Sequence, residues 1–212
     1  MDRARKTRKI YIEKNSMIEM MKAEISASVQ VKELLKADES LLKQIAVLAD
    51  DCIASLRVGG KIIFCGNGGS FADAQHLSSE FTSRFLFDRA PLASVVLGAN
   101  SSAMSAIGND YGYDQVFARE VIAIGQAQDV MIAISTSGNS SNIISAVQAA
   151  LKIGMKTVVL TGQSGGKLQE LVSCLNVPSD DTARIQECHI LIGHMICGIV
   201  EAEMFREKEL NG

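Results

Sequence analysis

The chain has 212 residues, which is enough for one well-buried domain and short for two. Apolar residues make up 47% of it and charged residues 21%, proportions that are ordinary for a soluble globular protein. The formal net charge is −3, aromatic residues make up only 5%, and tryptophan is absent. A nucleic-acid partner is therefore disfavoured, because such binding needs a basic surface and stacking side chains.

The cysteines and the N-terminus both indicate a cytoplasmic protein. Five cysteines are scattered through apolar runs without a Cys-x-x-Cys pair, which predicts reduced thiols in a core. The basic start of the chain continues into Lys14 and Asn15, whereas a secretory signal would continue into an apolar stretch. No apolar run is expected to reach membrane-spanning length, so we expect no membrane partner.

The basic N-terminal segment also bears on the domain organisation. Residues 1–16 are expected to form a basic, flexible extension, with a nucleic-acid-binding arm as the alternative. Residues 17–212 are expected to form a single domain, because no internal boundary or low-complexity segment interrupts them.

Two long helices are predicted ahead of any strand. Apolar residues recur at helical intervals over residues 17–37, and again after Asp38, a residue type that favours helix N-termini. Gly59 and Gly60 are expected to end the second helix.

Short apolar runs then alternate with helical segments. The predicted strands are residues 61–65, 92–97, 129–134, 156–160 and 174–177, and the predicted helices are residues 71–84, 142–153 and 182 to about 208. Such alternation predicts parallel strands joined by right-handed crossovers, and the continuous apolar character of the runs predicts burial on both faces. The expected fold class is α/β: a three-layer α/β/α domain with a parallel sheet of four to five strands and long helices at both ends.

Three predicted strands end in loops of glycine, serine, threonine and asparagine: GNGGS (66–70), STSGNS (135–140) and TGQSGG (161–166). Ligands in such folds bind beyond the carboxyl ends of the strands. Hydroxyl and backbone N–H donors at a helix N-terminus can hold a phosphate, although the alternative is a turn that merely caps the helix. Neither a P-loop lysine nor the third glycine of a dinucleotide motif is present, which disfavours ATP and nicotinamide.

Histidines supply the remaining candidates for chemistry. His76 and Glu80 are four residues apart and share a helix face, where they can bind zinc or share a proton. The alternative is a weak ion pair on an exposed face. His189 and His194 are five residues apart, about 140° around a helix, so they should not face one site. Each alone is otherwise read as a satisfied core residue.

Five blocks follow one another along the chain: FCGNGGSFADAQHLSSEF, GNDYGYDQVFAREV, AISTSGNSSNII, LTGQSGGKL and ARIQECHILIGH. Together they resemble the phosphoheptose isomerases, the sedoheptulose 7-phosphate isomerase branch of the SIS (sugar isomerase) family. The resemblance covers about residues 17–205. It implies an aldose–ketose isomerase that converts sedoheptulose 7-phosphate to D-glycero-D-manno-heptose 7-phosphate through an enediol, the first step of heptose synthesis for lipopolysaccharide or capsule.

The same resemblance implies roles for individual residues. Glu80 and His194 match the catalytic acid–base pair. One Zn²⁺ per subunit is implied, and its matching ligands are His76, Glu80, Gln186 and His194. A metal-bound carboxylate or imidazole is a poor base, so the metal's role, catalytic or structural, stays open. The matching substrate-binding residues are Asn67, Gly68, Gly69, Glu80, Asn109, Asp110, Ser135, Thr136, Ser137, Ser140 and Gln186.

Members of the family assemble as homotetramers with sites shared between subunits, which implies the same here. The alternatives are a non-catalytic SIS protein that associates with the bacterial replication initiator and a phosphosugar-binding regulator. The initiator-associating relatives lack the acidic residue matching Glu80 and the histidine matching His194. This chain has both, which favours the enzyme.

Overall fold

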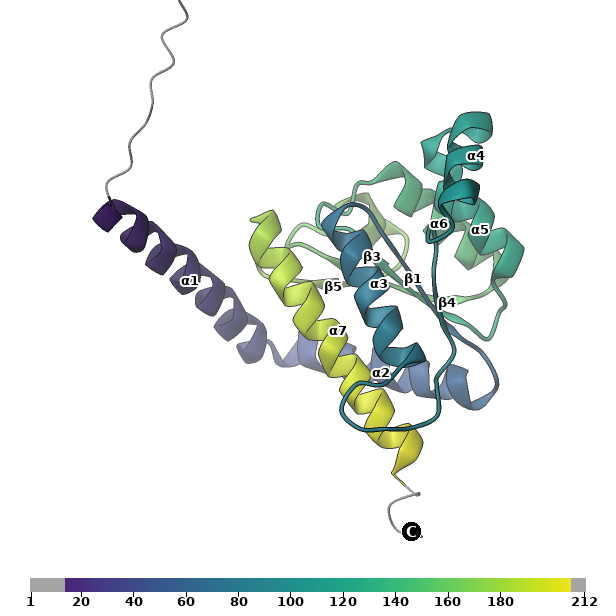
Figure 1. Cartoon of the computed structure of the whole chain (residues 1–212), viewed down its shortest axis with the longest axis horizontal. Coiled ribbons are helices and arrows are strands. Elements are labelled where there is room, and N and C mark those ends of the chain that lie inside the picture. The colour runs from purple at the N-terminus through teal and green to yellow at the C-terminus, as the bar shows by residue number, and fades with distance from the viewer. Residues whose placement is uncertain (1–13, 207–212) are drawn as a thin grey trace, which may run out of the picture.

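A computed structural model of the chain describes residues 14–206, with a five-stranded parallel sheet at its centre (Figure 1). The strand order is β2-β1-β3-β4-β5, and every neighbouring pair is parallel. The strands are β1 (Ile62–Gly66), β2 (Ser94–Val96), β3 (Val130–Ile134), β4 (Lys156–Thr161) and β5 (Ser173–Asn176). The helices are α1 (Lys14–Ala37), α2 (Glu39–Arg57), α3 (Gly69–Thr82), α4 (Ser101–Tyr111), α5 (Val116–Ile124), α6 (Ser141–Ile153) and α7 (Thr182–Phe205), with short 3₁₀ helices at Tyr113–Gln115 and Gly166–Glu170.

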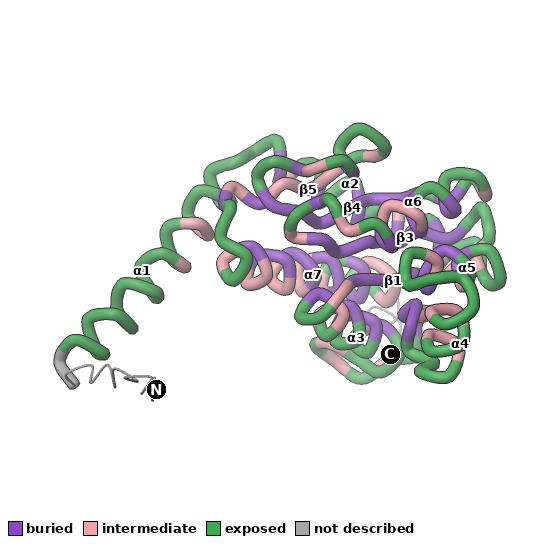
Figure 2. Tube along the Cα trace, turned by 90° about the horizontal axis from the view of Figure 1, so that it is seen from above, coloured by how far each residue is buried: buried purple, intermediate pink, exposed green. Residues whose placement is uncertain are grey.

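Helices cover both faces of the sheet and make the three expected layers (Figure 2). Ile62 and Phe64 of β1 pack into a core shared with α2, α3 and α7. Ile63 and Cys65, which point the other way, pack into a second core shared with α5 and α6. Successive strand side chains face opposite sides, so a strand buried on both faces needs apolar residues throughout. The predicted α/β class is confirmed.

The elements differ from the prediction in two places. Neither α4 nor α5 is predicted by the apolar pattern, because α4 is mostly small and polar residues without a fully buried side chain and α5 has only nine residues. The first helix begins at Lys14, inside the expected extension of residues 1–16, and residues 1–13 of that extension lie outside the described part. Asp38 caps α2 as predicted, accepting a hydrogen bond from the Leu41 N–H.

The last helix, α7, is long and apolar enough to cross a membrane by length and composition, contrary to the expectation that no apolar run reaches this length. Its surroundings are those of a core helix, because it packs against α2 and α3 and contributes residues such as Ile192 and Ile196 to the first core. It also buries the polar side chains of His189 and Glu201 inside the protein. The apolar character of α7 is thus accounted for by burial against protein.

The five cysteines form no disulfide, as predicted for reduced thiols. Four of them are buried, whereas Cys174 is only half-buried. Burial raises the pKa of both the Cys65 and Cys197 thiols to about 12, which keeps these sulfurs protonated and unreactive at neutral pH.

His189 is fully buried in the core, which agrees with the expectation that a histidine standing alone is a core residue. Its Nε2 lies 3.2 Å from the Thr161 carbonyl oxygen at the end of β4, and its Nδ1 has no partner among the described residues. Burial lowers the pKa of His189 to about 4, and the hydrogen bond to Thr161 offsets only part of that effect. The imidazole is therefore neutral in the folded protein at neutral pH.

This burial predicts an acid-sensitive fold. The unfolded chain binds a proton at this histidine below about pH 6.5, whereas the folded chain does so only near pH 4, so stability falls as the pH drops through that window. Replacing His189 with Gln should flatten the fall, by up to about 1.4 kcal/mol per pH unit. Urea unfolding of both proteins from pH 7 to pH 4 measures this. Parallel stability curves for the two would contradict it.

Candidate active site

Three polar side chains from α3 and α7 converge on one point. The His76 Nε2 lies 2.8 Å from the His194 Nε2 and 3.4 Å from the Glu80 Oε1. One ligand atom from each of the three lies within 4.8 Å of the others. The side chain of His76 is 48% exposed and that of Glu80 18%, so the group opens to solvent. We call His76, Glu80 and His194 the His–Glu cluster; it unites both predicted acid–base residues with a predicted metal ligand.

Close packing of α3 on α7 makes this convergence possible. A Cβ atom at Gly193 would lie 2.4 Å from both terminal carbons of Leu77, which is fully buried. Leu77 directly follows His76, and Gly193 directly precedes His194. The missing side chain at Gly193 therefore lets the two helices approach at the level of their imidazoles.

Two residues that the sequence patterns did not single out lie beside the cluster. The Phe85 ring stacks on the His194 ring, with centroids 5.5 Å apart and an interplanar angle of 19°. Asp73 lies one turn before His76, and its Oδ2 is buried without a hydrogen-bond partner among the described residues. Burial raises the pKa of Asp73, and the nearby His76 and His194 oppose that rise only in part. The three-residue spacing of Asp73 and His76, which puts both on one helix face, was the one sequence signal that could have identified Asp73.

The donor set of the cluster suits a zinc ion. Two imidazole nitrogens and one carboxylate are a common ligand set for Zn²⁺ in enzymes, and such sites leave a position open. Both Nε2 atoms point to the same spot, beside the Glu80 carboxylate. The predicted fourth ligand, Gln186, lies two turns earlier on α7, with its side-chain amide against Gly69. Its role as a ligand stays a prediction.

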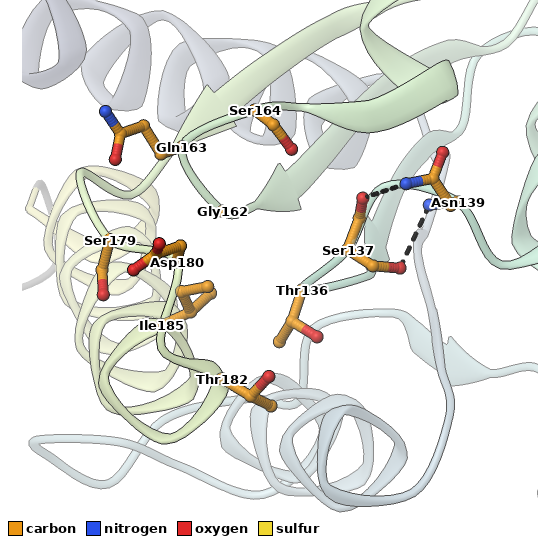
Figure 3. Close-up of a pocket in the computed structure, with 10 residues that line it drawn as sticks. All are labelled: Thr136, Ser137, Asn139, Gly162, Gln163, Ser164, Ser179, Asp180, Thr182 and Ile185. Atoms are coloured by element: carbon orange, nitrogen blue, oxygen red, sulfur yellow. Dashed lines mark hydrogen bonds between the residues drawn. The ribbon is translucent and has the colours of Figure 1, made fainter.

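The hydroxyl-rich loops line a cavity of about 590 Å³ at the carboxyl ends of the strands (Figure 3). Of the predicted phosphate-binding residues, Thr136 and Ser137 face this cavity. Ser135 is buried and donates to the Ser140 Oγ at 3.3 Å. Ser140 occupies the N-cap of α6, but its hydroxyl accepts no capping hydrogen bond from a described backbone N–H, which weakens the helix-capping alternative. The lining comprises Thr136, Ser137, Asn139, Gly162, Gln163, Ser164, Ser179, Asp180, Thr182 and Ile185.

Backbone contact between two loops shapes this cavity. Gly138 has φ 64°, and a Cβ atom there would lie 2.0 Å from the Gly165 carbonyl oxygen, so only glycine fits. The Leu168 N–H donates to the Gly138 carbonyl at 3.1 Å, and the Gly162 N–H donates to the Thr136 carbonyl at 3.0 Å. The loops at 135–140 and 161–166 therefore hold each other in place.

The glycine loop at 66–70 is fixed by an amide pair. The Asn67 and Asn142 side chains each donate to the other at 2.9 Å, and the Tyr113 hydroxyl donates to the Asn67 Oδ1 at 3.4 Å. Asn142 is buried at the start of α6 and was missed, because nothing in its position distinguishes it from an ordinary helical asparagine. Gly68 and Gly69 lie exposed beside this pair, at the N-terminus of α3.

The predicted sugar contacts at Asn109 and Asp110 lie elsewhere in the chain. Both are exposed at the end of α4, where the Asn109 amide donates to the Asp110 carboxylate at 2.8 Å. In Figures 1 and 2, α4 lies beyond α3 as seen from α7. Within one chain, the structure does not bring these two residues to the His–Glu cluster.

The chain is similar to known proteins over most of its length. A family model described as the SIS domain matches residues 28–162. A protein of Aneurinibacillus thermoaerophilus named phosphoheptose isomerase is 50% identical over 193 residues, which cover 91% of this chain and 98% of that protein. One from Burkholderia pseudomallei with the same name is 48% identical over 185 residues, which cover 87% of this chain and 94% of that protein.

Solved structures agree with these relatives. The phosphoheptose isomerase of Neisseria gonorrhoeae is 42% identical, with a TM-score of 0.82 over 88% of this chain and 99% of that one. That of Francisella tularensis is 38% identical, with a TM-score of 0.83 over 87% and 98%. From the shared fold, the SIS domain match and identity near one half, we conclude that the chain belongs to the phosphoheptose isomerase family of SIS-domain proteins.

Proposed function

We propose that this protein is an aldose–ketose isomerase that converts sedoheptulose 7-phosphate to D-glycero-D-manno-heptose 7-phosphate. The relatives that match nine-tenths of the chain are named for phosphoheptose isomerisation. The observation that carries the proposal is the convergence of His76, Glu80 and His194, because it supplies a carboxylate oxygen 3.4 Å from one imidazole and a second imidazole 2.8 Å from the first. That convergence favours an enzyme over an initiator-associating protein or a phosphosugar-binding regulator.

The chemistry moves protons at two carbons and at their two oxygens. A base removes a proton from C1 of the ketose, and the electron pair of that bond forms the C1=C2 double bond as the C2 oxygen takes up a proton. The resulting enediol accepts a proton at C2 and loses one from the C1 hydroxyl, which leaves the aldose. Glu80 and His194 fill the base and acid roles, and the hydroxyls of Thr136 and Ser137 hold the phosphate at the far end.

We further propose that His76, Glu80 and His194, joined by Gln186, hold one Zn²⁺ per chain. Two imidazoles and a carboxylate fit this ion, as their converging ligand atoms suggest. When bound, the metal would polarise the substrate carbonyl as a Lewis acid.

A homotetramer with shared sites is part of the same proposal. Helix α1 extends away from the rest of the chain (Figure 1) and touches α7 through polar groups, with the Ser28 hydroxyl donating to Glu187 and Arg184 pairing with Glu24. Most of its apolar side chains are left exposed, whereas Leu35 and Val31 near its end pack into the core. The exposed ones are Met17, Ile18, Met20, Met21, Ile25, Val29 and Leu34. Apolar surface of this extent is typical of an interface between chains. Sedimentation equilibrium distinguishes a tetramer from a monomer.

A shared site would also give Asn109 and Asp110 a role, because a second chain can bring them to the cluster of the first.

We propose a cytoplasmic location, since the sugar phosphate is a soluble metabolite. The product would feed heptose synthesis for lipopolysaccharide or capsule.

The catalytic assignment predicts the behaviour of two variants. Glu80→Gln and His194→Gln should each lower kcat for sedoheptulose 7-phosphate by about 10²–10⁴-fold, because each removes one proton-transfer group. Glu203→Gln, which changes a surface carboxylate on α7, is the control and should retain activity. Product formation is followed with and without a chelator. Wild-type kcat in either cluster variant would remove this mechanism.

The phosphate site has its own test. Ser137→Ala should weaken binding of sedoheptulose 7-phosphate by about 0.5–1.5 kcal/mol, or up to about 3 if the lost hydrogen bond is charge-assisted. Ser135→Ala and Ser140→Ala should do the same if these hydroxyls turn towards the bound phosphate. Unphosphorylated sedoheptulose should hardly respond, and neither should Ser40→Ala on the exposed face of α2. Equal losses for both sugars in calorimetry would place the phosphate elsewhere.

Metal analysis tests the zinc site. Purified protein should contain about one zinc per chain, and His76→Ala should lose it because one of the converging ligands is gone. His189→Gln, which changes a histidine buried away from the cluster, should keep its zinc. Full activity of zinc-free protein in the presence of a chelator would leave the cluster as a metal-free acid–base site.

A further inference from the structure

A buried ion pair lies beside the His–Glu cluster and takes no part in the mechanism above. The Arg89 Nε donates to the Glu201 Oε1 at 2.9 Å, and the two side chains are only 3% and 1% exposed. Glu201 also accepts hydrogen bonds from the backbone N–H groups of Phe85 at 2.8 Å and Leu86 at 2.6 Å. A buried charge pair is tolerated only when its remaining hydrogen-bonding positions are filled, and here they are.

Arg89 reaches the end of the helix that carries Glu80. Its guanidinium donates to the Glu80 carbonyl oxygen at 2.7 Å and the Phe81 carbonyl oxygen at 2.7 Å. It also donates to the Ser83 carbonyl oxygen at 3.0 Å. Helix α3 ends at Thr82, so the last carbonyls of the helix lack partners within it and favour a nearby cation. Arg89 therefore fixes the turn from which the Glu80 side chain projects.

Glu201 is linked to the cluster through Phe85 and through α7. It lies seven residues after His194 on α7, almost two full turns, so both side chains leave the same face of that helix. The Phe85 N–H that it accepts belongs to the residue whose ring stacks on His194. The ion pair thus ties together the turn that bears Glu80, the ring against His194 and the helix that bears His194.

The charge on Glu201 is part of this arrangement. Burial acts to raise its pKa, but the hydrogen bonds from Phe85, Leu86 and Arg89 outweigh burial and lower the pKa. The carboxylate is therefore ionised at neutral pH, and it accepts from all three donors at once.

We propose that Arg89 and Glu201 are positioning residues for the His–Glu cluster: they hold Glu80 and His194 at the separation at which these side chains bind a metal and exchange protons. The inference rests on the proposed function for its catalytic part. Its metal-binding part stands on the ligand geometry alone, so the two can fail separately.

The chain offers a matched control for a test at Glu201. Asp129 is another buried carboxylate, which accepts from the backbone N–H groups of Lys61 and Gln126 and from the Lys61 ammonium. It lies just before β3, at the amino edge of the sheet and away from the cluster. Glu201→Gln and Asp129→Asn each replace a buried carboxylate that accepts three hydrogen bonds by the corresponding amide.

The test measures zinc affinity by competition with a chromophoric chelator, using folded full-length protein below its melting temperature. Both variants should be less stable than the parent. Only Glu201→Gln should bind zinc more weakly, by about tenfold or more, as is typical when a residue that orients metal ligands is lost. It should also lower kcat for sedoheptulose 7-phosphate by a similar factor while KM changes less than about twofold, because the phosphate loops are outside this network.

A second pair of variants covers the case in which Glu201→Gln does not fold. Phe85→Leu removes the ring from His194 but keeps the backbone N–H that Glu201 accepts, and it should weaken zinc binding too. Phe87→Leu is its control. Phe87 lies in the same segment as Phe85, but its ring makes an edge-to-face contact with Phe205. Zinc affinity equal to that of the matched control, in either Glu201→Gln or Phe85→Leu, would make the ion pair purely structural and overturn the proposal. A parent protein that binds zinc but isomerises nothing would instead overturn the proposed function.

Discussion

The close approach of α3 and α7 is the contact on which the site depends. Gly193 leaves room for the buried Leu77 side chain, which a Cβ atom there would contact at 2.4 Å, and the histidines next to these two residues meet at 2.8 Å. Protein interiors are close-packed, so a contact this short cannot be absorbed nearby. The separation of the helices therefore also sets the separation of the side chains in the His–Glu cluster.

The rest of the molecule stabilises that contact in layers. One apolar face of the sheet packs against α3 and α7, which lie side by side on it, through residues such as Phe64 and Ile132. The pair of Arg89 and Glu201 fastens the far ends of the two helices, and the loop between them places Phe85 on His194. Near their N-termini, Gln186 of α7 lies against Gly69 of α3.

Two kinds of chemistry lie in different parts of this frame. The phosphate-type cavity is at the carboxyl ends of the strands, where loops of small residues present hydroxyls and backbone amides. The His–Glu cluster lies partway along the two helices, which the strand-end rule does not anticipate. The cluster residues are not among the described residues that line the cavity, and Gln186 of α7 lies against Gly69 at the start of α3.

The amino-acid sequence by itself determined the α/β class, the five strands, the hydroxyl loops and the pairing of His76 with Glu80, because strand burial, turn chemistry and helix periodicity are local properties of the chain. It also separated His189 from His194 by helical angle. The family resemblance implied one site for His76 and His194, and the tertiary structure shows that they meet across 118 positions of sequence. Only the tertiary structure decided that Asn142 pairs with Asn67 and that Glu201 binds Arg89. These contacts arise from helix packing, which depends on the shape of side chains distant in sequence, and no local pattern encodes that shape. For the same reason α4, whose residues bury no side chain, left no periodic signal to predict.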